Sequence, residues 1–421
     1  MRYFSAICRT LWLLIFSLSA VDAAEITDLY EAQVPAQASQ SQWQRAAFSA
    51  VLLKLTGSDA VLADPEIAAE LKNSGSYVKQ FKSIQINAQP MMIVQLDAQK
   101  ITALLQREQI AIWGSRRPDQ LLWFSEKLQD KPQLVMDAEH PLRKALLEQA
   151  KVFGLSYVFP FYDVDDLTLI NEQSLWAGDW PAIQGASLRY QTNDVFNLLF
   201  DQFTDASGTV TFRLTVQQWQ DGQMQSREFI QQDAMQLAVD FSRDLAKNLA
   251  AKYAVVVNSA QTAEQALTIT IEGVQNLRDL DRMQKIFNSL LTVRSHRLQQ
   301  FRQGQAVFQV ELAANPDDFY RSMQLVRQLR PESELAPELS AAELALDAQF
   351  AAATDNEILA NPADDTGTNA ALEGNESGTV QGVETDTSVQ AAEDTELNEL
   401  PLANDSASQL QKTNRYTLLG S

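Results

Sequence analysis

The chain has 421 residues, of which 45% are hydrophobic, and its formal net charge is −21. One cysteine and two histidines argue against a disulfide-stabilised fold and against a zinc site built from the usual Cys and His ligands. The acidic balance also argues against nucleic-acid binding. A chain of this length can build about two or three hydrophobic cores.

Residues 1–23 have the layout of a secretory signal peptide. Arginines precede an apolar run at residues 11–20, and small residues follow at positions 21–23. The run has about half the length that a membrane-spanning helix needs. We therefore expect a cleaved signal, a periplasmic location and no membrane span after cleavage. Cys8 comes before the apolar run rather than at the cleavage point, which argues against lipidation.

The negative charge is concentrated at the C-terminal end. Residues 331–421 hold 18 of the 54 acidic residues but only two basic ones, Lys412 and Arg415, so their net charge is −16. They contain no tryptophan and few large apolar side chains, and cannot bury enough surface to offset the entropy of ordering. We predict a disordered acidic tail over residues 331–421. The final RYTLLGS is interpreted as a frayed end, with a docking motif as the alternative.

Residues 24–118 are predicted to form an N-terminal α/β domain. An apolar stripe predicts a helix over residues 42–55, and Gly57 stands where that helix would stop. The other expected elements are a strand at 26–34, a short helix after Pro65, paired strands at 77–86 and 90–98, and a helix over 98–108.

Residues 119–258 are predicted to form a second α/β domain. It begins with a buried strand at 120–126, followed by a helix that Pro141 starts and Gly154 stops. The segment GLSYVFPFYDVDD, residues 154–166, is predicted as a strand that ends in carboxylates. A helix over 182–190, an antiparallel meander and a long helix over 234–253 complete what we expect to be a mixed sheet with covering helices, an α/β sandwich.

Residues 264–330 show the clearest pattern. The run LTITIE alternates apolar and polar residues, and the predicted order of elements is β-α-β-β-α. This order resembles a small ferredoxin-like or secretin-type periplasmic module. Such modules usually bind neighbouring proteins, although a fold alone does not decide function. The predicted fold class is therefore multi-domain α/β and α+β, with this C-terminal module ahead of the tail.

Several motifs support a family resemblance. The stretches LYEAQVP, AAFSAVLLKLTG, LSYVFPFYDVDD and ASLRYQTNDVF resemble an uncharacterised periplasmic family of proteobacteria, a domain of unknown function (DUF), over most of residues 25–330. The middle domain is similar to the TolB N-terminal, CsgG and LpoB type, and the tandem order is similar to the flagellar assembly protein FlgT. The resemblance implies a periplasmic partner-binding or assembly role, and it offers no known catalytic residues to carry over to this chain. CsgG and LpoB are lipoproteins, however, and the acidic tail has no counterpart in these proteins.

The acidic run Asp163, Asp165 and Asp166 is the part of the sequence that looks most like a chemical site. Carboxylates at the end of a strand stand where ligands often bind in α/β sheets. The run lacks the ligand spacing and the glycine of a loop for Ca²⁺ or Mg²⁺, however, and Asp166 could cap the next helix. We expect a solvated, capping loop. A partner contact at Asp163 and Asp165, and a metal or catalytic site, are the alternatives.

Two further groups are candidate partner contacts. Trp176 and Trp180 lie in a stretch with Gly and Pro, where they either cover the core, form an exposed binding patch or stack on a glycan. Arg294 and Arg297 belong to a cluster of six basic residues at 278–302. This cluster is either a set of solvated faces or a basic face onto which the acidic tail folds, in competition with an anionic partner.

The sequence contains no GxSxG, P-loop or GxGxxG motif. His140 is expected to serve a helix start or to face solvent, and His296 to lie on an exposed strand face. We therefore expect a non-enzymatic adaptor or assembly factor that binds envelope or periplasmic proteins and needs no cofactor. The alternatives are a carboxylate-dependent envelope hydrolase using residues such as Asp163 and Asp165, and a small-ligand module at the tryptophan loop. Partner identity and oligomeric state are not predicted.

Overall fold

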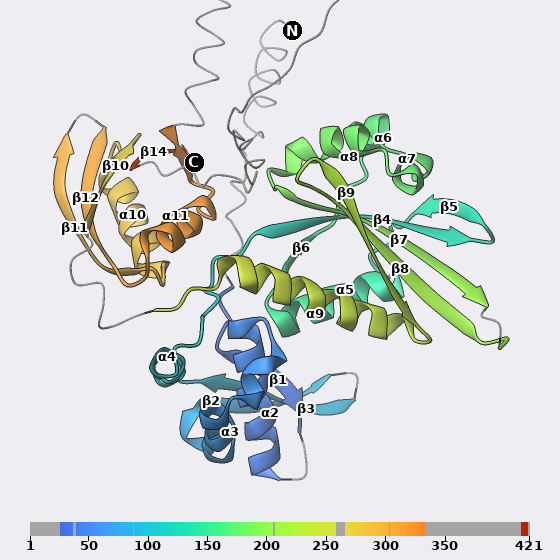
Figure 1. Ribbon diagram of the computed structural model, residues 1–421, viewed down its shortest axis with the longest axis horizontal. Helices are drawn as coiled ribbons and strands as arrows, with labels where there is room; N and C mark the ends of the chain where they lie inside the picture. Colours follow the sequence, from blue (N-terminus) through green and yellow to red (C-terminus); the bar gives the residue numbers. More distant parts are fainter. Residues whose placement is uncertain are drawn as a thin grey trace, which may run out of the picture. The chain divides into compact units, whose positions relative to one another are not determined.

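The structure is a computed structural model that describes residues 26–36, 39–86, 88–204, 207–257, 266–302, 304–332 and 414–419. These residues form three sheets with covering helices (Figure 1), which confirms the predicted fold class. The predicted signal peptide and the predicted disordered tail between residues 333 and 413 lie outside the described residues.

The first sheet has the strand order β1-β3-β2, all antiparallel, with bounds Glu31–Pro35, Gln89–Leu96 and Val78–Ile86. The helices around its core are α2 (Gln40–Thr56), α3 (Pro65–Glu70) and α4 (Ala98–Arg107), and the 3-10 turns are η2 (Asp59–Ala63) and η3 (Leu71–Tyr77). The predicted elements of this domain are confirmed, although β1 begins at Glu31 because residues 27–30 form a turn.

The second sheet has the order β5-β4-β7-β8-β9, and β6 also pairs with β4. Strand β4 (Asp119–Leu128) lies parallel to β6 (Ser156–Val158) and β7 (Asp194–Thr204). The antiparallel strands are β5 (Lys131–Leu134), β8 (Val210–Gln220) and β9 (Gln223–Gln231). The predicted buried strand and meander are therefore confirmed.

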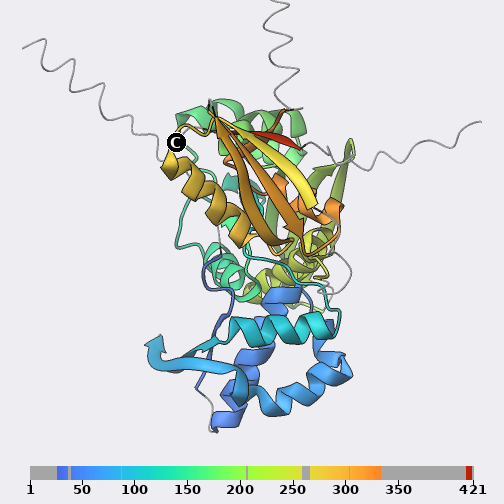
Figure 2. The same ribbon diagram turned by 90° about the vertical axis from the view of Figure 1, so that its left-hand side faces the viewer.

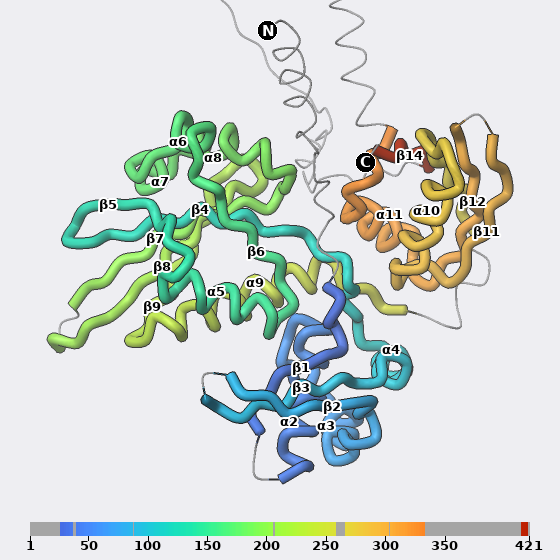
Figure 3. The backbone as a smooth tube through the Cα atoms, turned by 180° about the vertical axis from the view of Figure 1, so that it is seen from behind, coloured from blue at the N-terminus to red at the C-terminus, as the bar shows by residue number. Residues whose placement is uncertain are grey.

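Helices cover both faces of the second sheet, which confirms the predicted sandwich (Figures 1 and 3). On one face lie α5 (Pro141–Phe153) and α9 (Ala234–Tyr253). On the other lie α6 (Val164–Leu169), α7 (Glu172–Ala177), α8 (Trp180–Ser187) and the 3-10 turn η4 (Leu188–Tyr190). The prediction of one strand through residues 154–166 is wrong: β6 has only three residues, and the chain then turns into α6.

The third sheet has the order β11-β12-β10-β14-β13. The predicted β-α-β-β-α order is confirmed by β10 (Ala266–Glu272), α10 (Leu277–Ser289), β11 (Val293–Arg302), β12 (Gln305–Leu312) and α11 (Pro316–Gln324). Two short strands add to it, β13 (Leu329–Pro331) and β14 (Arg415–Leu418). In Figure 2 the red β14 lies beside the yellow β10.

The interpretation of the C-terminal RYTLLGS as a frayed end is wrong for residues 415–419. Arg415–Leu418 form a strand between β10 and β13, and Tyr416 and Leu418 are buried in the third core. The predicted disordered tail therefore does not include these residues, because two alternate apolar side chains give the segment a buried face.

A buried arginine connects the ends of two helices. The Arg117 guanidinium donates hydrogen bonds of 2.6–3.1 Å to five main-chain carbonyls, those of Lys54, Trp113, Gly114, Phe153 and Gly154. Its pKa is lowered to about 9 because burial disfavours the charge. Gly154 ends α5 at φ 65°, as predicted, and a Cβ there would lie 2.7 Å from Nη1 of Arg117. Gly154 is therefore required both to end the helix and to leave room for the Arg117 guanidinium.

Candidate protein-interaction surface

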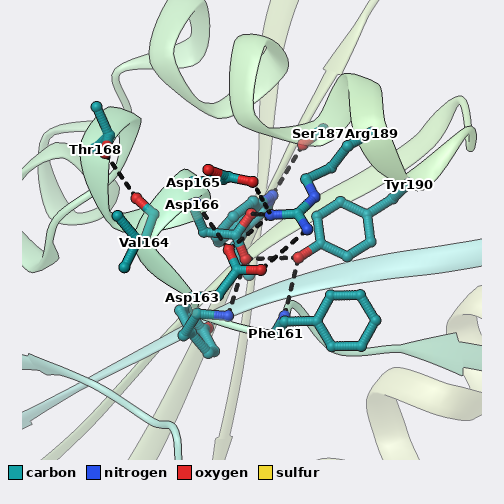
Figure 4. A network of polar contacts seen from close by, with 11 residues as sticks. Phe161, Asp163, Val164, Asp165, Asp166, Thr168, Ser187, Arg189 and Tyr190 are labelled. Atoms are coloured by element: carbon teal, nitrogen blue, oxygen red, sulfur yellow. Dashed lines mark hydrogen bonds and ion pairs between the residues drawn. The ribbon is translucent and has the colours of Figure 1, made fainter. Parts of the chain in front are cut away.

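The acidic run caps a helix, and its three carboxylates pair with one arginine (Figure 4). Asp163 is the N-cap of α6, and its Oδ1 accepts a hydrogen bond of 3.2 Å from the main-chain N–H of Asp166. Arg189, from η4, donates to both carboxylate oxygens of Asp163 at 2.6 and 3.0 Å. The predicted helix-capping role of this run is therefore confirmed, at Asp163 rather than at Asp166.

Asp166 is fully buried and connects the loop to the sheet. Its Oδ2 accepts hydrogen bonds from the Tyr162 N–H at 2.8 Å and the Tyr190 hydroxyl at 2.6 Å, and Arg189 lies 3.3 Å from its Oδ1. The Tyr162 hydroxyl in turn donates to the carbonyl of Phe124 on β4 at 3.1 Å. This network fixes residues 161–166 against the rest of the domain.

The electrostatics of the network do not suit acid catalysis. The hydrogen bonds from Arg189 lower the pKa of Asp163, so this carboxylate stays ionised at neutral pH. Asp165 is 82% exposed and lies 3.7 Å from the same guanidinium. The three carboxylates and the one guanidinium together have a formal charge of −2. Within the described residues, no group of three or more His, Cys, Asp or Glu side chains could hold a metal ion.

Helix α6 has the opposite polarity to an ordinary surface helix. Its buried side chain is Asp166, whereas Val164 is 79% exposed and Leu167, one turn later, is 44% exposed. Phe161, just before the cap, is 74% exposed, and its ring lies 5.7 Å from that of Tyr190. We call Phe161, Val164 and Leu167, together with the neighbouring Asp165 and Arg189, the α6 surface. Figure 4 shows Phe161 and Val164 on either side of Asp163.

The two tryptophans predicted as a partner contact, Trp176 and Trp180, lie in different environments. Trp180 is only 3% exposed, because α8 begins at this residue and directs it into the core beside Leu121 and Trp123. It covers the core, and its assignment to an exposed patch is wrong. Trp176 is half-buried: its Nε1 donates to the Ser125 hydroxyl at 2.7 Å, and the Nζ of Lys127 lies 4.3 Å from its ring centre.

Beside Trp180 lies an open groove that the sequence did not predict. The groove has a volume of about 400 Å³, and its lining includes Leu188, Gln191 and Trp219. Trp219 is 42% exposed, and its ring lies 6.2 Å from that of Trp180. Its place near the end of β8, ahead of the QDGQ turn, was the available signal for an exposed aromatic side chain.

The basic residues of the third domain do not form one face. Arg297 lies opposite Gln309 of β12, on the side of the sheet away from Phe308, which packs against Phe287 of α10. Arg294 lies at a bulge in β11, and both arginines are exposed. The other members of the predicted cluster, except Arg302, lie on α10 across the sheet: Arg278, Arg282 and Lys285. The hypothesis of a single basic face for the acidic tail is therefore not supported.

Both histidines have structural neighbours. His140 stands at the N-cap of α5 without capping it, and its Nε2 lies 3.2 Å from the Glu126 carboxylate. His296 turns toward Phe287, with ring centres 5.5 Å apart, and burial lowers its pKa. His140 therefore stands at the predicted helix start without capping it, and His296 is half-buried rather than exposed, because both rings pack against aromatic side chains.

The described residues thus define an α+β protein with three sheets and an exposed apolar segment on a fixed loop. In comparison with known proteins, a family model described as a domain of unknown function (DUF8605) matches residues 23–114. This match contains the first sheet and its helices. No curated protein and no solved structure matches the chain. No helix among the described residues has the length and apolar character to cross a membrane.

Proposed function

We propose that the chain is a non-enzymatic periplasmic adaptor or assembly factor that binds a cell-envelope protein through the α6 surface. The observation that carries the proposal is the polarity of α6, which exposes Val164 and Leu167 and buries Asp166. Burying a carboxylate is costly unless it is paired, and here Arg189 and two tyrosines supply the partners. The loop that presents the apolar side chains is therefore held in place before any partner arrives.

The composition of the α6 surface indicates the chemistry of the partner. An exposed aromatic side chain beside an arginine, here Phe161 beside Arg189, is typical of protein interfaces, and the exposed Val164 and Leu167 extend the apolar area around it. The formal charge of −2 around Arg189 favours a partner with an apolar pocket and basic residues at its rim. The N-terminal signal layout and the resemblance to TolB, CsgG, LpoB and FlgT domains support a periplasmic site of action.

The arrangement of the carboxylates argues against the hydrolase alternative. A general acid needs a raised pKa, whereas Arg189 lowers the pKa of Asp163. Asp163 also caps α6 and accepts two hydrogen bonds from the guanidinium, so its oxygens are already engaged. Asp165 faces the same guanidinium.

A photo-crosslinking residue placed at Val164 of the full-length chain in intact cells tests the proposal. Leu277, at the start of α10, is the matched control because it is also 79% exposed and apolar. We expect position 164 to capture one envelope protein reproducibly, and position 277 not to capture it. The same products at both positions, or none at position 164, would contradict the proposal.

A second candidate function is binding of a small aromatic or sugar ligand in the groove at Trp219. Its volume of about 400 Å³ lies within the range of ligand pockets. If this function is correct, a panel of such ligands contains one that quenches tryptophan fluorescence, and Trp219→Ala abolishes the response. Val164→Ser should leave the response unchanged.

A further inference from the structure

The third sheet contains a strand slot that a distant part of the chain fills. β10 flanks the slot in parallel and β13 in antiparallel orientation, and β14 completes the main-chain pairing of both. At its two ends, the Thr270 N–H donates to the carbonyl of Asn414 and the Leu419 N–H donates to that of Gln328, both at 2.8 Å. Among the described strands β13 pairs with β14 alone. Without β14, the backbone edges of β10 and β13 would both be open.

The walls of the slot recognise alternate side chains of the inserted segment. Tyr416 lies opposite Ile271 and Leu418 opposite Leu329, and all four side chains belong to the third core. The side chain of Arg415 points to the other face, where its guanidinium lies 3.6 Å from Glu272 and 3.3 Å from Glu332. The slot therefore favours an extended segment with a basic residue, then an aromatic residue and a leucine at alternate positions.

Two further features fit the slot to this segment. Tyr320 of α11 donates a hydrogen bond of 2.7 Å to the Asn414 side chain. Gly273, at φ 80°, approaches the backbone of β14 so closely that a Cβ on it would lie 2.7 Å from the carbonyl oxygen of Leu418. A side chain at position 273 would thus collide with the inserted strand.

We propose that the slot is an exchangeable strand-binding site, into which the C-terminal segment of one copy of the chain inserts in place of that of another copy. The occupant is a second copy because its identical segment satisfies every contact described above. Residues 332–414, which join β13 to β14, can reach at most about 300 Å when extended, so the connection does not restrict β14 to its own slot. Reciprocal exchange joins two copies and one-way exchange joins a row of copies.

Cysteine crosslinking between two differently tagged, full-length variants tests the exchange. Both carry Cys8→Ser, one adds Arg330→Cys on β13 and the other Thr417→Cys on β14, because these two positions oppose each other in the register. We expect a crosslinked heterodimer whose yield rises with protein concentration. A synthetic peptide of residues 414–419 should lower the yield about tenfold when it is present well above its dissociation constant. A scrambled peptide of the same composition serves as the control.

Three outcomes would overturn the proposal. The first is that the mixed variants stay monomeric at every concentration while a chain with both cysteines crosslinks within itself, which means a closed and non-exchanging strand. The second is that the peptide and its scrambled control act alike, since the dimer would then not use the slot. The third is that, in an envelope extract, the Arg330→Cys variant captures a foreign protein instead of a second copy, which identifies a partner's strand as the occupant.

Discussion

Replacing the buried side chain of Asp166 with the methyl group of alanine should destabilise the second domain more than any surface change near it. Asp166→Ala removes the acceptor of the Tyr162 N–H and of the Tyr190 hydroxyl, as well as an ionic neighbour of Arg189. A buried donor that loses its partner costs about 1–3 kcal/mol. With two orphaned donors and a weakened arginine pair, we expect the free energy of unfolding to fall by about 3–5 kcal/mol.

Asp165→Ala is the matched control, since the same residue type is removed one position earlier. The Asp165 side chain is 82% exposed and its carboxylate lies 3.7 Å from Arg189, so the change should cost less than about 1 kcal/mol. Urea unfolding followed by tryptophan fluorescence reports on this domain, which holds four of the seven tryptophans, Trp123, Trp176, Trp180 and Trp219. If Asp166→Ala and Asp165→Ala differ by less than about 1 kcal/mol, the buried carboxylate does not hold the loop in place.

The same kinds of contact support three further predictions. Arg117→Met should lower the free energy of unfolding by about 3–5 kcal/mol, because five carbonyls lose their donor. Arg107 is exposed, so Arg107→Met is the control, and equal urea midpoints for the two variants would contradict this prediction. The lowered pKa of Asp163 contributes stability above its ordinary value of 3.8, and this stability is lost as the pH falls through the folded-state pKa. The difference in urea midpoint between the parent and Asp163→Asn should therefore shrink from pH 7 to pH 3, and a constant difference would refute the pairing. Removal of residues 414–421 should expose the core around Ile271 and lower the free energy of unfolding by about 3–6 kcal/mol. Hydrogen exchange should then show that β13 loses protection and that α2 is unchanged. A β13 that stays protected would contradict its pairing with β14.

Local patterns in the sequence predicted most of the helices and strands. Gly57 and Gly154 end α2 and α5 because each adopts a left-handed conformation that favours glycine. The strict alternation in LTITIE predicted β10 correctly, because one face of that strand is buried. In these cases the decisive interactions involve residues close together in the chain.

The features that were missed depend on contacts between distant residues. The burial of Asp166 in α6 could not be predicted, because a hydrophobic pattern assigns carboxylates to solvent. Its ionic partner, Arg189, lies 23 residues away in the sequence. β14 has two apolar residues at alternate positions, a weak signal at the end of an acidic stretch, and its pairing partners are more than 80 residues away in sequence. Arg117 gave no signal either, because its partners are carbonyls, which every residue has.

The position of Arg117 bears on how the N-terminal domain could be separated from the chain. The matched family region ends at residue 114, three positions before the arginine that donates to the carbonyl of Lys54 inside that region. A fragment of residues 23–114 would therefore leave this helix-end carbonyl without the donor it has in the whole chain. The region that matches the family model is thus shorter than the segment that includes the donor to the Lys54 carbonyl. An autonomous version of this domain requires either a longer boundary or a substitute donor.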